Sequence, residues 1–218
     1  RPGRGLPAGR AVRQGLVALK GTFVEIRKYR EVLRFLIARM IYADGMTTLF
    51  AFGGVYAAGT FGMSVAEVIQ FGIALNVTAG LGAVAFGWLD DRIGAKLVIW
   101  INLLALLALS LAALLVDSKE AFWAIGIALG IFVGPTQSAS RSMMARLTPE
   151  RLQTEFFGLY ALSGKATAFL GPLLLGLATE FFDSQRAGMA TILAFFAVGF
   201  LLLLPVKDPA TAPRKSQP

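Results

Sequence analysis

Three ionisable side chains stand inside long apolar stretches of the sequence. They are Arg39, Asp44 and Lys165. If these stretches cross a bilayer, an ionised group at its centre costs at least about 2.5–3.5 kcal/mol, so it normally faces a partner or a water-filled cavity. Asp44 and Lys165 have opposite signs. The chemistry that they offer is therefore ion pairing, binding of a charged solute, or transfer of a proton.

Asp44 and Lys165 are predicted to lie at the same depth. Asp44 follows Phe35, where its apolar segment begins, by nine residues, and Lys165 follows Glu155 by ten. At a helical rise of about 1.5 Å per residue, both lie roughly 14 Å from the same side. We expect the two side chains to face one cavity and to pair, directly or through water. Thr48, at i+4 from Asp44, extends the polar face of that helix.

Other roles are open to each of these charges. Lys165 can serve as a fixed cation for an anionic group of a solute, such as a carboxylate. Asp44 can carry a coupling proton if burial favours its neutral form. A static ion pair that only holds two helices together is the simplest alternative. Arg39 lies about one turn inside the boundary, where its side chain can snorkel to the headgroups.

Further polar side chains could line the same cavity. Gln137 and Arg141 are spaced i, i+4 and share one helix face. We expect Gln137 to face the solute and Arg141 to lie at the inner mouth. Asn76 is a further candidate on another apolar segment.

Six apolar segments of spanning length position these residues. A transmembrane helix needs about 20 mostly apolar residues, and the chain is 56% hydrophobic with only 16% charged residues. The sequence therefore predicts an all-α membrane protein with a six-transmembrane-helix bundle over 35–206, a linker over 1–34 that holds a basic amphipathic helix from residue 11, and a tail over 207–218. The predicted spans are 35–58, 65–89, 97–116, 121–146, 155–179 and 187–206.

The distribution of positive charge predicts the orientation. With the amino end inside, seventeen of the 21 Lys and Arg fall on the inner side, and only Lys119 and Arg186 fall on the outer side. Cytoplasmic loops carry such an excess of Lys and Arg. Both termini are therefore predicted to be cytoplasmic.

Small residues mark predicted packing faces. Gly126, Gly130 and Gly134 repeat every four residues in the fourth span, which lets helix backbones approach closely. In the fifth span Gly164, Ala168, Pro172 and Gly176 repeat in the same way. The Gly-Pro pairs at 134–135 and 171–172 could mark bends.

Several classes of function are excluded by the residue types. The chain has no Cys and no His, so thiol nucleophiles, thiolate metal sites and imidazole chemistry are impossible. Only Asp44 is a carboxylate deep in a span, so we expect no catalytic site, no metal and no cofactor other than a coupled proton. Nine of the 21 Lys and Arg precede residue 35, which favours anionic lipid over nucleic acid as the partner. A membrane assembly or scaffold protein is the alternative to a transporter.

The loop between the second and third spans is dense in glycine and charge, reading GWLDDRIGAK from Gly87 to Lys96. Asp91 at a helix end can pair with a basic residue or lie at a neighbouring helix N-terminus. Gly94 permits a tight turn, and Arg92 and Lys96 favour the inner side. Such a cluster can latch one conformation and release in another.

This loop resembles the signature loop of the major facilitator superfamily, G-x-L-x-D-R-x-G-R/K-R/K. Ala95 stands where a basic residue is usual. The match holds at Gly87, Leu89, Asp91, Arg92, Gly94 and Lys96. In that superfamily the loop joins the second and third helices of each six-helix half, as it does here. The resemblance implies one half of a major facilitator fold and a secondary transporter that rocks two bundles around a central site.

Other segments resemble one branch of this superfamily. Tyr29–Phe35 leads into Tyr42–Gly45, and Gln137–Ser142 and Glu155–Lys165 follow later. They are similar to the carboxy-terminal half of the branch that contains the autophagy-related vacuolar amino-acid effluxer and its bacterial relatives. Amino-acid efflux characterises the fungal members, so the small solute is left open, and the bacterial members imply the inner (plasma) membrane.

The resemblance also bears on the solute site and on completeness. The three-helix repeats of the family place the first and fourth spans in equivalent cavity-lining positions, which makes Asp44 and Gln137 the expected solute-side pair. The resemblance implies helices seven to twelve of a twelve-helix parent. Because Arg1 stands in what looks like the central linker, we expect a missing amino-terminal six-helix half. A half-size chain that assembles with a second one is the alternative.

Overall fold

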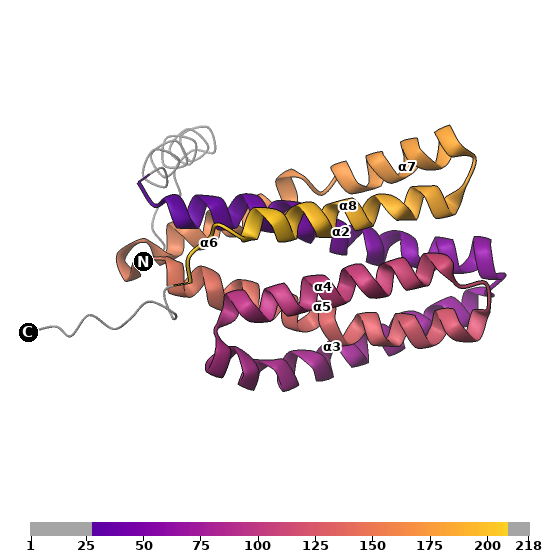
Figure 1. The fold of residues 1–218 in the computed structure, drawn as a ribbon, viewed down its shortest axis with the longest axis horizontal. Helices are drawn as coiled ribbons and strands as arrows, with labels where there is room; N and C mark the ends of the chain where they lie inside the picture. Colours follow the sequence, from indigo (N-terminus) through magenta and orange to yellow (C-terminus); the bar gives the residue numbers. More distant parts are fainter. Residues whose placement is uncertain (1–27, 209–218) are drawn as a thin grey trace, which may run out of the picture.

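The computed structural model describes residues 28–208, and within that range the chain is a bundle of helices without a β-strand (Figure 1). This confirms the predicted all-α class. The elements are α2 Arg30–Phe61, α3 Val65–Ile93, α4 Ala95–Leu115, α5 Lys119–Leu147, the 3₁₀ turn η1 Glu150–Leu152, α6 Gln153–Ala166, α7 Leu170–Phe182 and α8 Gln185–Leu203.

Six helical segments of the described range are long and apolar enough to cross a membrane. Five are single helices, and the other, Glu150–Phe182, comprises η1, α6 and α7. They coincide with the six predicted spans, although α2 begins at Arg30 rather than at residue 35. The predicted amphipathic helix falls mainly on residues 1–27, which lie outside the described residues.

The helices form two groups that lie side by side (Figure 1). In one group α5 packs on both α3 and α4, and in the other α8 packs on both α2 and α7. Helix α4 also packs on α8 and joins the groups. The largest fully buried side chains come from both groups and include Phe35, Tyr42, Ile99, Leu103, Met143, Phe156 and Phe196.

One end of the bundle collects most of the positive charge, and we call it the basic end. It contains the starts of α2 and α4, the ends of α3 and α5, η1, and the segment 204–208 that follows α8. Its described Lys and Arg are Lys28, Arg30, Arg34, Arg92, Lys96, Arg146, Arg151 and Lys207. The opposite end carries only Lys119 and Arg186 within residues 28–208.

The predicted glycine stripe of α5 is a packing face. A Cβ added at Gly126 would overlap the Phe71 ring, and a Cβ at Gly130 or Gly134 would overlap atoms of Thr78 or Ala79 on α3. The α3 helix reciprocates at Gly82, where a Cβ would overlap the carbonyl oxygen of Ile131. These glycines therefore let the backbones of α3 and α5 touch. Helix α5 continues through Pro135 as one helix to Leu147.

The predicted fifth span, 155–179, is not one continuous helix. It breaks after Ala166 and resumes at Leu170. Proline lacks an N–H and clashes within a helix interior, but it is tolerated in the first turn. The break places Pro172 third in α7, where its missing N–H removes no intrahelical bond. The break also interrupts the small-residue stripe that was predicted for this span, because Gly164 lies on α6 and Gly176 on α7.

We expect Gly82→Ala to destabilise the bundle and Gly80→Ala to leave it intact. A Cβ at Gly82 would overlap the backbone of Ile131, whereas a Cβ at Gly80 would meet no atom within 4 Å. Overpacking of this kind costs about 1–3 kcal/mol, while Ala otherwise improves a helix interior by roughly 1 kcal/mol over Gly. Thermal unfolding of both variants in one detergent, followed by circular dichroism, measures the difference. Equal melting temperatures would contradict the tight α3–α5 contact.

Candidate functional site

A polar pocket of about 360 Å³ opens between α2, α5 and α6. Polar lining residues alternate with apolar ones such as Met46 and Phe50. The polar and charged side chains that line it are Arg39, Tyr42, Thr47, Gln137, Ser140, Arg141 and Tyr160. The structure thus brings Gln137 and Arg141 together on one face, as predicted, and adds Arg39 to them.

Arg141 is an exposed, unengaged cation in this pocket. Its guanidinium has no hydrogen bond or ion pair with any residue in 28–208, and Gln137, one turn earlier on the same helix, is exposed as well. Both side chains are therefore available to a solute. Their common face follows from the i, i+4 spacing that the sequence shows.

Arg39 is held in place rather than snorkelling to the headgroups. Its Nη1 donates to the carbonyl oxygen of Tyr160 at 2.9 Å and to Oγ of Ser163 at 3.1 Å. Its guanidinium carbon also lies 3.6 Å from the centre of the Tyr160 ring. A cation over an aromatic face is attracted by the negative ring face. Arg39 therefore fixes α2 to the carboxy-terminal turns of α6.

A second polar contact, between Tyr42 and Ser140, joins α2 to α5 at the wall of the pocket. The Tyr42 hydroxyl lies 2.8 Å from Oγ of Ser140 in a hydrogen bond, and Ser140 also donates to the Thr136 carbonyl. Tyr42 is fully buried, and a Cβ added at Gly199 of α8 would overlap its side chain. The backbone and Cβ of Tyr42 thus pack against α8 while its hydroxyl bonds to α5.

Asp44 lies at the helix break and not beside Lys165. Its Oδ2 accepts a hydrogen bond from the backbone N–H of Gly171 at 2.9 Å, and the residue is 3% exposed. Lys165 is exposed, and its ammonium has no hydrogen bond or ion pair within residues 28–208. The predicted direct ion pair is therefore wrong. The prediction assumed a continuous fifth helix, whereas the break frees backbone N–H groups that the carboxylate can bind.

Arg39 and Asp44 together match the polarity of the two short helices. A helix carries partial negative charge at its C-terminus and partial positive charge at its N-terminus. The cation contacts the last turns of α6, and the carboxylate contacts the first turn of α7. Helix α2 therefore places a cation near the end of α6 and a carboxylate at the start of α7.

The remaining predicted polar candidates have local partners. Thr48 is buried, donates to the Asp44 carbonyl at 2.8 Å, and lies against Gly171, where a Cβ would overlap its hydroxyl. Asn76 is exposed on α3 and donates to the Gly72 carbonyl of its own helix at 2.8 Å. It does not line the pocket. No group of three or more potential metal-ligating side chains occurs within the described residues.

The signature loop forms the tight α3–α4 turn at the basic end. Gly94 has φ +88°, a value that favours glycine. The closest ion pair of the loop is between Asp90 and Arg146 of α5, at 3.1 Å, while Asp91 lies 4.0 Å from the same guanidinium. The Asp90 side chain is 11% exposed and that of Asp91 is 84% exposed. Asp91 does approach a basic residue, as predicted, but sequence reasoning missed Asp90 as the principal acid.

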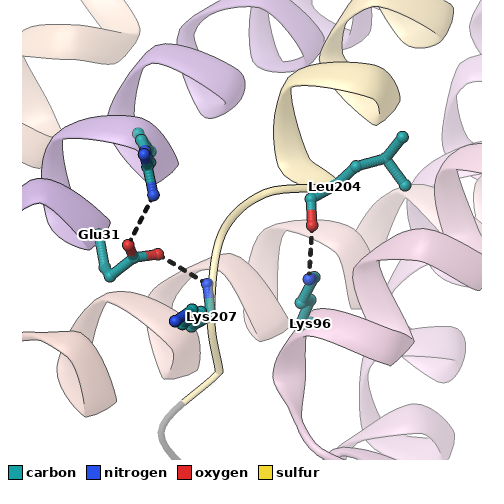
Figure 2. A network of polar contacts seen from close by, with 5 residues as sticks. Glu31, Lys96, Leu204 and Lys207 are labelled. Atoms are coloured by element: carbon teal, nitrogen blue, oxygen red, sulfur yellow. Dashed lines mark hydrogen bonds and ion pairs between the residues drawn. The ribbon is translucent and has the colours of Figure 1, made fainter.

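The other loop residues face outward or toward the end of the chain. A Cβ at Gly87 would meet no atom within 4 Å. The Arg92 guanidinium lies 3.6 Å from the centre of the Trp88 ring. Lys96 contacts the segment that follows α8: its Nζ donates to the Leu204 carbonyl at 2.9 Å (Figure 2). The loop is therefore tied to α5 through its acids and to the end of α8 through its lysine.

Comparisons with known proteins agree with the sequence resemblance. A family model described as "Vacuole effluxer Atg22 like" matches residues 1–212. The chain is 25% identical over 187 residues to the uncharacterized MFS-type transporter YxiO of Bacillus subtilis, covering 86% of this chain and 44% of that protein. It is 26% identical over 203 residues to autophagy-related protein 22 of Saccharomyces cerevisiae, covering 88% of this chain and 38% of that protein.

The chain thus spans less than half the length of these curated relatives. The name of the Bacillus relative and the family description are those of transporters and not of enzymes, as the sequence predicted. Together with the six spanning segments, they identify an integral membrane protein.

We expect Asp90→Asn to weaken the basic end far more than Asp91→Asn. Removing one partner of a buried ion pair costs about 3–5 kcal/mol, whereas an exposed pair contributes about 0–1 kcal/mol. The two neutral variants are matched in chemistry and differ only in burial. Thermal unfolding of each variant in detergent is the measurement. A larger loss for Asp91→Asn would contradict the assignment of Asp90 as the principal acid.

Proposed function

The chain belongs to the family of Atg22-like vacuole effluxers, and from this premise we propose that its bundle is one half of a major facilitator transporter for a small solute. The polar pocket between α2, α5 and α6 is the part of this half that binds the solute. The unengaged guanidinium of Arg141 is the observation that carries the proposal.

The charge of the pocket favours an anionic group on the solute. Arg39 and Arg141 both line it, and none of the described residues that line it is acidic. Arg39 is already bonded to α6, so it supplies a fixed positive field. Arg141 can form a charge-assisted hydrogen bond, which is shorter and stronger than a neutral one. A carboxylate fits this arrangement, and an amino acid is the solute class that we propose.

Transport by alternating access requires a second bundle that closes the pocket from the other side. We propose that this partner is either an amino-terminal six-helix half or a second half-size chain. The two bundles rock around the shared site, with the basic end facing the cytoplasm. The excess of Lys and Arg at that end supports this orientation, and the Bacillus relative supports a bacterial plasma membrane.

Asp44 is the proposed coupling residue. Its Oδ2 is bonded to Gly171, but its Oδ1 is buried and has no hydrogen-bond partner within residues 28–208. A buried charged oxygen without a partner is costly. A proton on Oδ1 would remove that cost and leave the bond at Oδ2 intact. Release of the proton would strengthen the contact with the positive N-terminus of α7, so protonation can alter how firmly α7 is held.

Arg141→Gln should weaken solute binding in the complete transporter that contains this bundle. Loss of one charged donor costs about 1.5–3 kcal/mol, which corresponds to a roughly ten- to hundredfold higher solute concentration for half-maximal uptake. The concentration for half-maximal uptake is measured for a panel of amino acids in proteoliposomes, with Asn76→Ala as the control outside the pocket. Unchanged concentration dependence in Arg141→Gln would exclude this pocket as the solute site.

Labelling of single introduced cysteines distinguishes a water-accessible pocket from a buried packing contact. The chain has no native Cys, so Gln137→Cys reports on the pocket and Asn102→Cys, at a fully buried position, reports background. A water-borne maleimide should modify only the first. Protection of both positions in the membrane would favour the assembly protein over the transporter.

Asp44→Asn should uncouple transport from the proton gradient and leave exchange of solute across the membrane. The amide oxygen can still accept from Gly171, but the side chain can no longer take up a proton. Uptake driven by a pH gradient should fall to the rate without a gradient, while counterflow persists. If solute accumulation by Asp44→Asn still follows the pH gradient, the coupling group lies elsewhere. If accumulation by the unmodified protein follows a sodium gradient instead, the coupling ion is sodium and not the proton.

A further inference from the structure

A groove of about 630 Å³ lies at the basic end between the start of α4 and the segment that follows α8. It is separate from the solute pocket and shares no lining residue with it. Lys96 and Trp100 line it from α4, and the backbone and side chains of 204–208 line it from the other side. The groove therefore combines two lysines with an apolar floor.

The segment 204–208 is anchored at several points, which makes the groove a formed feature. The Lys207 N–H donates to Oε2 of Glu31 at 2.7 Å, and Nζ of Lys96 donates to the Leu204 carbonyl at 2.9 Å (Figure 2). Val206 is fully buried. Asp208 accepts from the Lys96 N–H at 3.2 Å and is 4% exposed. The segment thus bridges the starts of α2 and α4.

The positive charge of the groove is only partly used. The ammonium of Lys207 is exposed and has no hydrogen bond or ion pair within the described residues, because only its backbone N–H is engaged. The ammonium of Lys96 has one bond and lies 4.6 Å from the centre of the Trp100 ring, so further donors remain. The one acid, Asp208, is buried against the start of α4. The open side of the groove therefore favours an anion.

The groove continues into a lipid-facing surface. Leu97 and Leu204, which flank it, are 43% and 41% exposed. Further exposed apolar side chains follow along the same two helices, at Ile101 and Leu104 of α4 and at Leu201 of α8. Trp100 lies between the lysines of the basic end and the leucines farther along the helices, and tryptophan is enriched at this level of a membrane, the interface. An occupant would meet positive charge at one end and hydrocarbon along the rest.

We propose that this groove binds an anionic phospholipid, with its phosphate at the ammonium of Lys96 and its acyl chains along α4 and α8. The side chain of Lys207 lies on the other side of the segment 204–208 (Figure 2) and adds positive charge to the same site. A free phosphate would use the lysines but not the apolar flank. A bound lipid would hold α4 and the segment 204–208 together, and so stabilise the junction between the two helix groups. The proposal depends on membrane residence and not on the proposed transport.

The test compares lipid binding by the purified chain and its variants by native mass spectrometry. The probes are phosphatidylglycerol and phosphatidylcholine with identical acyl chains. The variants are Lys207→Gln, which keeps the backbone bond to Glu31, and Lys96→Gln/Lys207→Gln. Lys119→Gln removes one charge from the opposite end and is the matched control. Circular dichroism and the melting temperature confirm that each variant is folded.

We expect the unmodified chain to retain phosphatidylglycerol over phosphatidylcholine, and each lysine removed from the groove to reduce that preference about fivefold, as expected for about 1 kcal/mol per basic residue near an anionic surface. Lys119→Gln should keep the full preference. Equal preference in the folded double variant would overturn the proposal. Loss of phosphatidylglycerol from the unmodified chain on addition of inorganic phosphate would also overturn it, because a free anion would then be the occupant. Transport defects in Arg141→Gln leave this result unaffected.

Discussion

The contact between α2 and the broken helix is the constraint on which the site depends. Helices α6 and α7 have 14 and 13 residues, so each is roughly 20 Å long and neither alone crosses a hydrocarbon core of about 30 Å. The break between them exposes backbone groups that no lipid can satisfy. Asp44 of α2 accepts from one of the freed groups, the N–H of Gly171, and Arg39 of the same helix bonds to the turn of α6 that precedes the break. Without these two contacts, α2 would no longer fix the positions of α6 and α7. The pocket would then lose the wall that α6 forms.

The helices around this contact are packed with unequal tightness, and the looser contacts are where relative motion costs the least free energy. Helices α3 and α5 touch through their backbones at glycines, so they can only move together. The Asp90–Arg146 pair joins the same helices again at the basic end. By contrast, α2 meets α5 through side chains, in the Tyr42–Ser140 bond beside the pocket and in the ring contacts of Tyr56 and Phe61 with Phe122 near the other end. Rocking within this half would therefore change the α2–α5 spacing before it disturbed the α3–α5 pair.

The sequence predicted those features that a single residue type or a long pattern determines. Hydropathy located six spans because a bilayer demands length and apolarity, and the four-residue glycine spacing located the α3–α5 face. Gly94 marked its turn because the backbone there needs positive φ. The signature loop indicated the family, which the comparisons confirmed. The shared face of Gln137 and Arg141 followed from their spacing.

Contacts made by backbone groups were beyond such reasoning. Any residue has an N–H, so nothing in the sequence marked Gly171 as the partner of Asp44. The depth argument for Lys165 treated 155–179 as one continuous helix. The Gly171–Pro172 pair indicated only a bend, and the break itself lies before it, between Ala166 and Leu170. The choice between Asp90 and Asp91 depended on which side of α3 faces Arg146, and adjacent residues on a helix differ by about 100°. A segment such as 204–208 has no periodicity, so its role in joining α2 and α4 could only come from the structure.

The charges that remain unpaired indicate what the open face of this half must meet. Arg39 and Asp44 each bond to the broken span, whereas the guanidinium of Arg141 and the ammonium of Lys165 are exposed and have no partner within residues 28–208. Lipid on that face would cost free energy for each ionised group inside the hydrocarbon core, at least about 2.5 kcal/mol for a group at its centre. Lys165 adjoins Gly164, which lines the same pocket as Arg141. Two unpaired cations on one side of a membrane bundle are stable against water or a complementary protein surface. This supports our proposal that a second bundle packs on the pocket side and that an anionic solute lies between the two bundles.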